Sequence, residues 1–383
     1  MQTYYISRIG GVAAIAALLA AGVFAIGRAR ADFQFRQQSP GAVARAVALQ
    51  PGNTEYLALR ALQIDYGGGD PRPLLQRAAE LNPLSSAPRI RLGLDAEIRG
   101  DYATAEKWLL DAARIDRQFE PRWTLANFYF RRQDRQAFWK WMREALAVSY
   151  GDRRPAFELC WQTSTDANEI LSRAFSGRRE ALAAYLGWLL ETHRTQAIAP
   201  VALKLAPDAD DRALVLAGDD ALLESGDGAG ALALWRAMGF AAPGGVYRGN
   251  FGDFKSRAAG HGFDWRWNET AGVVHAEIDA PRTMHRISFD GTQPESCELL
   301  RQTLLLKRGE HYRLRWQASV NQMESPTGIE WRIGETHAGV GNGTGEMEFV
   351  APADVAQLNL VYQRPNGEAR AEGMIELWGV SIR

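Results

Sequence analysis

The sequence is poor in the residues that build disulfide frameworks, metal sites and large charged patches. Its two cysteines, Cys160 and Cys297, lie in segments of different character, which excludes a disulfide framework and argues against a metal site. Five of the 44 Lys and Arg residues are lysines, and the arginines are scattered rather than grouped in blocks. A formal net charge of −1 gives no bulk attraction to nucleic acid or anionic lipid. We therefore expect no metal, no cofactor and no nucleic-acid partner.

Motifs that carry catalysis are also missing. The six histidines show no HExxH spacing, and no G-x-S-x-G nucleophile turn occurs. The glycine-rich stretch 339–345 has no Lys and precedes no helical pattern, so it indicates a hairpin rather than a phosphate loop. Asp208, Asp210 and Asp211 precede a helical pattern, where capping explains them without a calcium ion. We predict that the protein is not an enzyme.

One long apolar run stands near the N-terminus. Residues 9–27 contain no charge, and these 19 residues approach the roughly 20 that cross a bilayer core. The run predicts either a single transmembrane anchor or a signal peptide cut after Ala29-Arg30-Ala31. We favour the anchor, because the run exceeds the usual signal core of about 7–15 residues. Arg8 before it and Arg28 and Arg36 after it leave the orientation undecided. We expect a single-pass protein of the bacterial inner membrane with its body in the periplasm, and a cytoplasmic body stays an alternative.

The middle of the chain, 39–240, has helical periodicity throughout and an internal repeat. Asn82-Pro83 aligns with Asp116-Arg117 at a period of 34. Ala105, Leu109 and Ala112 recur at helical spacing on one face of the second helix of this unit. Small residues at such positions allow two helices to cross closely, so we expect Ala105 at a helix crossing.

The repeat resembles the tetratricopeptide repeat (TPR) family. Leu92-Gly93 in one unit, and Trp123 and Phe130 in the next, occupy positions of the family pattern of small and large apolar residues. The resemblance implies a solenoid of helix pairs that binds protein partners, with the first helices lining a concave groove. In this chain it places four residues near the groove: Glu97, Phe128, Arg131 and Arg132.

Two tryptophans in the repeat region point to a further contact residue. Trp139 and Trp141 are two positions apart, so they cannot share one face of a helix. We expect at least one of them to be exposed or to cap the next helix pair, and Trp139 is a candidate contact with a partner.

The character of the sequence changes at residues 241–245. Beyond them, about ten short alternating runs are separated by Gly, Pro, Asn and Asp, which is typical of an all-β sandwich. The ten lie around Tyr247, Trp265, Val274, Ile287, Leu304, Leu314, Ile329, Met347, Leu358 and Leu377. In the clearest run, Leu314 and Trp316 alternate with Arg313, Arg315 and Gln317, so the apolar set faces the core and the polar set faces outward.

This C-terminal region resembles carbohydrate-binding jelly rolls of the galactose-binding type. The resemblance rests on Asn250-Phe251-Gly252-Asp253-Phe254, on residues 300–314 with Gln302, Gly309 and Tyr312, and on residues 376–382. It implies a glycan-binding or protein-binding module. The outward polar residues that are candidates for a site that binds an acidic glycan are Arg313, Arg315, Gln317, Arg332 and Asn359. They converge on one surface only when their strands belong to one sheet, and a solvated sheet face is the alternative.

The sequence thus predicts a multidomain protein with an N-terminal transmembrane helix, an all-α TPR-like solenoid and a C-terminal all-β jelly-roll-like sandwich. The expected segments are a flank at 1–8, the anchor at 9–27, a linker at 28–38, the repeat domain at 39–240 and the sandwich at 241–383. We expect a non-catalytic, membrane-anchored scaffold of the cell envelope, in polysaccharide synthesis or export. The alternative is a structural accessory subunit of a membrane complex without glycan binding.

Overall fold

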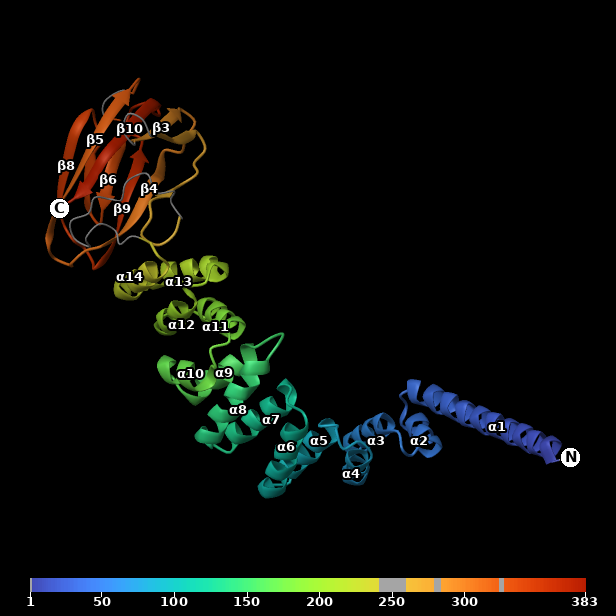
Figure 1. Cartoon of the computed structure of the whole chain (residues 1–383). Coiled ribbons are helices and arrows are strands. Elements are labelled where there is room, and N and C mark those ends of the chain that lie inside the picture. The colour runs from blue at the N-terminus through green and yellow to red at the C-terminus, as the bar shows by residue number, and fades with distance from the viewer. Residues whose placement is uncertain (1, 241–259, 279–283, 324–326) are drawn as a thin grey trace. The chain divides into compact units, whose positions relative to one another are not determined.

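The computed structural model describes residues 2–240, 260–278, 284–323 and 327–383, with side chains from residue 18 onward (Figure 1). The described chain forms two compact units. One holds residues 1–163 and 172–176, and the other holds residues 164–171 and 177–383. The sandwich therefore shares a compact unit with the last helices before it. The stretch 250–254, which supported the jelly-roll resemblance, and the strand expected around Tyr247 lie outside the described residues.

The first unit is helical. Its helices are α1 (Gln2–Arg36), α2 (Pro40–Leu49), α3 (Thr54–Tyr66), α4 (Arg72–Leu81), α5 (Ala87–Ile98), α6 (Tyr102–Ile115), α7 (Phe119–Arg131), α8 (Arg135–Val148) and α9 (Arg154–Thr163). Consecutive helices pack as antiparallel pairs along the chain, which is the arrangement that the repeat predicts. The linker expected at 28–38 is largely helical, because α1 continues to Arg36.

The transmembrane prediction is wrong. Within the part of the chain that the structure describes, no helix has the length and apolar character needed to span a membrane. The predicted single-pass location in the inner membrane is therefore wrong as well.

The repeat register is visible where α5 crosses α6. A Cβ added at Gly93 would lie 2.7 Å from Cδ2 of Leu109 and 3.2 Å from the carbonyl oxygen of Ala105. Ala105 itself has no exposed surface. The expected crossing at Ala105 is confirmed, since only a residue without a side chain fits opposite it.

The turns inside the helix pairs share one construction. Gly100 has φ +80° and Gln133 has φ +58°, so both are in the left-handed region. Each is followed by an aspartate, Asp101 or Asp134, whose carboxylate accepts a hydrogen bond from the backbone N–H three residues on. The same turn recurs at Gly226-Asp227 in the second unit. This local chemistry starts the second helix of each pair at a fixed position.

The second unit begins with helices and ends with the sandwich. Its helices are α11 (Arg179–Glu191), η1 (Thr195–Ala197), α12 (Ile198–Leu205), η2 (Ala209–Asp211), α13 (Arg212–Glu224) and α14 (Gly228–Ala237), while α10 (Ala167–Ala174) is divided between the units. Its strands are β1 (Arg266–Trp267), β2 (Val273–Ile278), β3 (Met284–Asp290), β4 (Ser296–Leu305), β5 (His311–Asn321), β6 (Ile329–Ile333), β7 (Thr336–Gly339), β8 (Gly343–Val350), β9 (Val355–Gln363) and β10 (Glu372–Ile382).

The strands form two antiparallel five-stranded sheets (Figure 1). We call the sheet of order β2-β3-β10-β5-β8 sheet A and the sheet of order β1-β4-β9-β6-β7 sheet B. Leu314 and Trp316 of sheet A share one buried core with Trp331 and Leu360 of sheet B. The expected sandwich is confirmed. Strand β7 was not predicted, because its four residues show no apolar alternation.

Candidate functional site

Two of the predicted partner-binding residues meet in the helical array. Glu97, near the end of α5, accepts two hydrogen bonds of 2.7 Å each from Arg131, at the end of α7. The two residues are 34 positions apart, so they occupy equivalent places in successive repeats. This bidentate geometry fixes both side chains on the first-helix side of two neighbouring pairs.

The other predicted contact residues are placed differently. The guanidinium of Arg132 lies over the ring of Tyr102, 3.7 Å from its centroid, and so belongs to a separate contact. Phe128 and Trp139 are both 3% exposed, which puts them in the core between helices. Trp139 and Trp141 are both buried, so the expectation that one of them is exposed is wrong. The buried residues of α8 form a stripe wide enough to include Trp139 at one margin and Trp141 at the other.

A hollow of about 550 Å³ adjoins Arg131 at the turn between α7 and α8. It is lined by Tyr129, Phe130, Arg131, Gln133, Asp134, Arg135, Phe138, Gln162 and Thr163. Of these nine residues, sequence reasoning singled out Arg131 as a contact. The sequence did not predict the left-handed backbone conformation of Gln133, which shapes this turn.

The sandwich divides the five predicted glycan residues between two sheets. Arg313, Arg315 and Gln317 lie on β5 of sheet A, whereas Arg332 lies on β6 and Asn359 on β9 of sheet B. All five alternate with core residues, so each points outward. Because the two sheets share one core, their outward faces lie on opposite sides of the sandwich. The structure therefore does not bring the five residues together on one surface.

On the outward face of sheet A, the arginines are neutralised across the strands. Arg313 pairs with Glu348, which is its register partner on β8, and Arg315 pairs with Glu346 at 3.2 Å. Arg286 on β3 pairs with Glu376 on β10 at 2.6 Å. Cross-strand pairs of this kind stabilise a solvated sheet and leave little net positive charge for an acidic ligand.

On the outward face of sheet B, one row of polar side chains crosses all five strands. The strand register aligns these residues in the order Arg266, Arg301, Asn359, Arg332 and His337. We call them the sheet B row. The Oδ1 atom of Asn359, in the middle of the row, is buried and has no hydrogen-bond donor among the residues that the structure describes. A buried acceptor without a donor is costly, so a movement that exposed this atom to a ligand hydroxyl or amide would relieve that cost.

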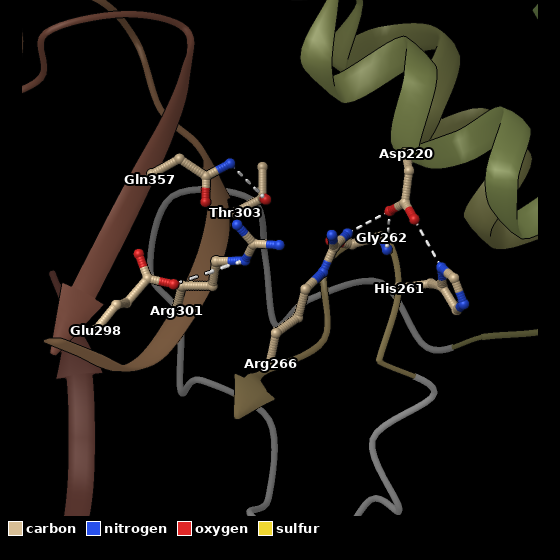
Figure 2. Close-up of polar contacts among 8 residues, drawn as sticks. All are labelled: Asp220, His261, Gly262, Arg266, Glu298, Arg301, Thr303 and Gln357. Atoms are coloured by element: carbon tan, nitrogen blue, oxygen red, sulfur yellow. Dashed lines mark hydrogen bonds and ion pairs between the residues drawn. The ribbon is translucent and has the colours of Figure 1, made fainter. Parts of the chain in front are cut away.

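Carboxylates balance the charge of the sheet B row. Glu330 binds Arg332 and lies 3.1 Å from Nδ1 of His337. Arg301 has the loosest pairing, at 3.9 Å from Glu298. In the next row Nε2 of Gln357 donates a 3.0 Å hydrogen bond to Oγ1 of Thr303, as Figure 2 shows beside Arg301. The face therefore presents donors and acceptors side by side with almost no net charge.

A second hollow, of about 590 Å³, opens at the end of β6, β7 and β9 and includes Glu330. It is lined by Thr327, Gly328, Ile329, Glu330, Gly339, Val340, Gly341, Gln363, Arg364, Pro365 and Asn366. An added Cβ at Gly339 or at Gly341 would meet no atom within 4 Å, so the bare backbone there faces open space. Glu330 links this hollow to the sheet B row.

The other end of the sheet B row meets α13. Arg266 forms an ion pair with Asp220, and the same carboxylate accepts a 2.8 Å hydrogen bond from the backbone N–H of Gly262. Its second oxygen lies 2.6 Å from Nδ1 of His261 (Figure 2). One carboxylate thus holds the segment that leads into β1.

No protein-family model and no curated protein matched the sequence. Among solved structures, the sandwich is similar to a structure titled "CBM4 structure and function", at 14% identity and a TM-score of 0.23 over 31% of this chain and 86% of that chain. The helical region is similar to the C-terminal part of a TPR repeat-containing protein from Cytophaga hutchinsonii, at 14% identity and a TM-score of 0.28 over 54% of this chain and 92% of that one. It is also similar to the Cut9–Hcn1 hetero-tetramer of the APC/C, at 13% identity and a TM-score of 0.29 over 56% of this chain and 38% of that one.

Proposed function

We propose that the chain is a non-catalytic binding protein whose helical array holds a protein partner and whose sandwich binds a glycan on the outward face of sheet B. The sheet B row carries the proposal. It places donors and acceptors in register across five strands, and the acceptor Oδ1 of Asn359 at its centre has no donor. Such a row matches a ligand that offers hydroxyl groups at regular intervals.

The charge balance of the face points to a neutral glycan. Every arginine of the sheet B row has a carboxylate nearby, and His337 shares Glu330 with Arg332. A sugar hydroxyl both donates and accepts, so an Arg beside a Glu satisfies it in both roles. An acidic chain would instead have to displace existing ion pairs. This reverses the preference for an acidic ligand that the count of outward arginines alone would give.

The hollow at Glu330 extends the proposed site at one end of the sheet B row. Its volume of about 590 Å³ falls within the range of about 300–1,000 Å³ that is typical of small-molecule sites. The bare backbone at Gly339 and Gly341 lets a ring approach closely, and Glu330 supplies an acceptor that Arg332 and His337 orient. A terminal sugar ring in this hollow would continue along the sheet B row.

The proposal that the helical array binds a protein is argued from the surface formed by the first helices of the pairs. The pair of Glu97 and Arg131 spans two repeats, and Arg131 also lines the hollow between α7 and α8. A partner segment that crosses two repeats would contact a surface whose polar groups are already held in place, so little side-chain entropy is lost on binding.

A glycan screen tests the proposal. Full-length protein would be screened on neutral and acidic polysaccharides, alongside Arg301→Ala on sheet B and Arg315→Ala on sheet A as the matched control. We expect binding to neutral glycans that Arg301→Ala weakens and Arg315→Ala leaves unchanged. If the protein binds no glycan at millimolar concentration, the glycan half is wrong and the protein-binding half stands alone.

A second candidate function is a structural subunit of a protein complex without glycan contact. It is favoured by a groove of about 670 Å³ between α1 and α2. Ile26, Phe33 and Leu49 line this groove and are 63%, 64% and 46% exposed. Clustered exposed apolar side chains mark protein interfaces. Failure of the glycan screen, together with stable complex formation that Phe33→Glu abolishes, would establish this alternative.

A further inference from the structure

Asp219 on α13 is a buried carboxyl group that forms no hydrogen bond with any described residue. Its side chain has no exposed surface, and both of its oxygens lack a donor within the described part of the chain. The group lies under the segment that leads into the sandwich. A Cβ added at Gly262 of that segment would lie 2.4 Å from Oδ2 of Asp219 and 2.5 Å from the ring of Trp235 on α14. Gly262 also has φ +60°, so the backbone packs on the carboxyl group at a place that only glycine suits.

The neighbouring residue Asp220 has the opposite environment. Its carboxylate receives the backbone N–H of Gly262 and the guanidinium of Arg266, and it contacts His261 (Figure 2). We call residues 261–266 the lead-in segment. It supplies hydrogen-bond donors to the carboxylate of Asp220, but it covers Asp219 without giving it a donor. The same segment therefore gives two adjacent carboxyl groups of α13 different environments: Asp220 is hydrogen-bonded, and Asp219 is buried without a donor from the segment.

The charged groups around Asp219 come from two elements. Asp220 belongs to the same helix, and Arg266 and His261 belong to the lead-in segment, while α14 contributes the uncharged ring of Trp235. Burial, and then the negative charge of Asp220, raise the pKa of Asp219 to about 7, although Arg266 opposes this rise. The group therefore binds a proton in the docked state at a pH where a solvated carboxyl group has already lost it.

We propose that residues 261–266 dock on α13 as a pH-sensitive latch, which is tight while Asp219 is protonated and loosens when Asp219 ionises. Ionisation places an unpaired negative charge under Gly262, and undocking is the movement that brings water to it. Arg266 is the ion-pair partner of Asp220 and the first member of the sheet B row. Undocking of the latch would therefore release Arg266 from α13 at that end of the row.

The direction of the pH effect follows from proton linkage. Undocked, Asp219 has an ordinary pKa near 3.8, and docked it has a pKa of about 7. Docking therefore takes up one proton between these values, and its equilibrium constant falls about tenfold for each unit of rising pH between about 4 and 7. Below this range the latch has its full strength, and above it the docking equilibrium no longer changes with Asp219.

Hydrogen exchange measured by mass spectrometry on the full-length protein tests the latch. Peptides that cover 260–267 would be followed from pH 4.5 to 8, after correction for the intrinsic pH dependence of amide exchange. In the wild type we expect protection to fall as pH rises to about 7 and then to level off. Asp219→Asn cannot ionise, so its protection should not fall as pH rises from 4.5 to 7.

A second variant and an internal reference separate loss of the latch from unfolding of the sandwich. Asp219→Leu removes the charge with an apolar side chain of similar size and should give the same flat profile. Peptides from β5 and β9 report whether the sandwich stays folded in each variant. Flat wild-type protection, or variants whose protection still falls between pH 4.5 and 7, would overturn the proposal.

Discussion

Glu97 and Arg131 hold the same position in two consecutive repeats and bind each other through two 2.7 Å hydrogen bonds. The repeat period of 34 thus appears as a physical contact between equivalent residues of opposite charge. Since each repeat packs mainly on its neighbours, such a contact couples one helix pair to the next. It also shows that the polar side of the array is ordered as well as its core.

The Glu97–Arg131 pair should contribute little to the free energy of unfolding. The side chain of Arg131 is 46% exposed, so water screens the pair and its coupling energy should be about 0.2–1 kcal/mol. A double-mutant cycle with Glu97→Ala and Arg131→Ala, followed by chemical denaturation, measures it. The coupling should shrink at high salt. A coupling of several kcal/mol that salt leaves unchanged would show that the pair is buried in solution.

The helix crossing at Ala105 should tolerate no larger side chain. Ala105 has no exposed surface and its carbonyl lies against Gly93, so Ala105→Trp should overpack the crossing and cost about 1–3 kcal/mol or more. Thermal unfolding reports the loss. Ala103→Trp, two residues away on the exposed side of α6, is the matched control and should change the midpoint little. Equal midpoints for the two variants would mean that the repeat register is misplaced.

The sandwich should lose stability in acid through two stacked histidines. Nε2 of His275 lies 2.9 Å from Nδ1 of His285, and the ring of Trp267 stacks on His275 at 3.5 Å. Burial lowers the pKa of His275 to about 4, and burial followed by the charge of His275 lowers the pKa of His285 to about 3. Unfolded histidines have a pKa near 6.5 and bind protons first, so stability is fully present above about 6.5 and falls as pH drops towards 3.

Urea unfolding of the sandwich between pH 7 and pH 4 checks this acid sensitivity. We expect the free energy of unfolding to fall with pH in the wild type and to fall less steeply in His285→Gln, which cannot take up the proton. The variant will be less stable at pH 7 if it packs poorly, so the slope against pH is the quantity to compare. Equal slopes would remove the histidine pair as the cause.

The sequence was informative where a local pattern determines structure. The spacing of Ala105, Leu109 and Ala112 predicted the helix crossing, and the alternation around Leu314 and Trp316 predicted which side of β5 faces the core. Both signals depend on residues close together in the chain. The stripe on α8 was misjudged because spacing alone does not reveal how wide a surface the neighbouring helices cover.

The candidate sites depend on long-range pairing that alternation does not encode. The alternation of apolar and polar residues predicted that Arg315 and Arg332 point outward. It could not predict that β5 and β6 belong to opposite sheets. Arg301 joins Asn359 only through the register of β4 with β9. Likewise, the contact of Asp220 with Gly262 links residues 42 positions apart, and no local pattern marks Asp219 as buried.

The measurement that tests the central claim most directly is a calorimetric titration of a neutral oligosaccharide into three proteins. They are the wild type, Asn359→Ala at the centre of the sheet B row and Gln317→Ala on the outward face of sheet A. If sheet B binds the glycan, Asn359→Ala should lose about tenfold or more in affinity, which corresponds to about 1.4 kcal/mol, and Gln317→Ala should match the wild type. Equal affinities for the wild type and Asn359→Ala, or a loss confined to Gln317→Ala, would contradict the account.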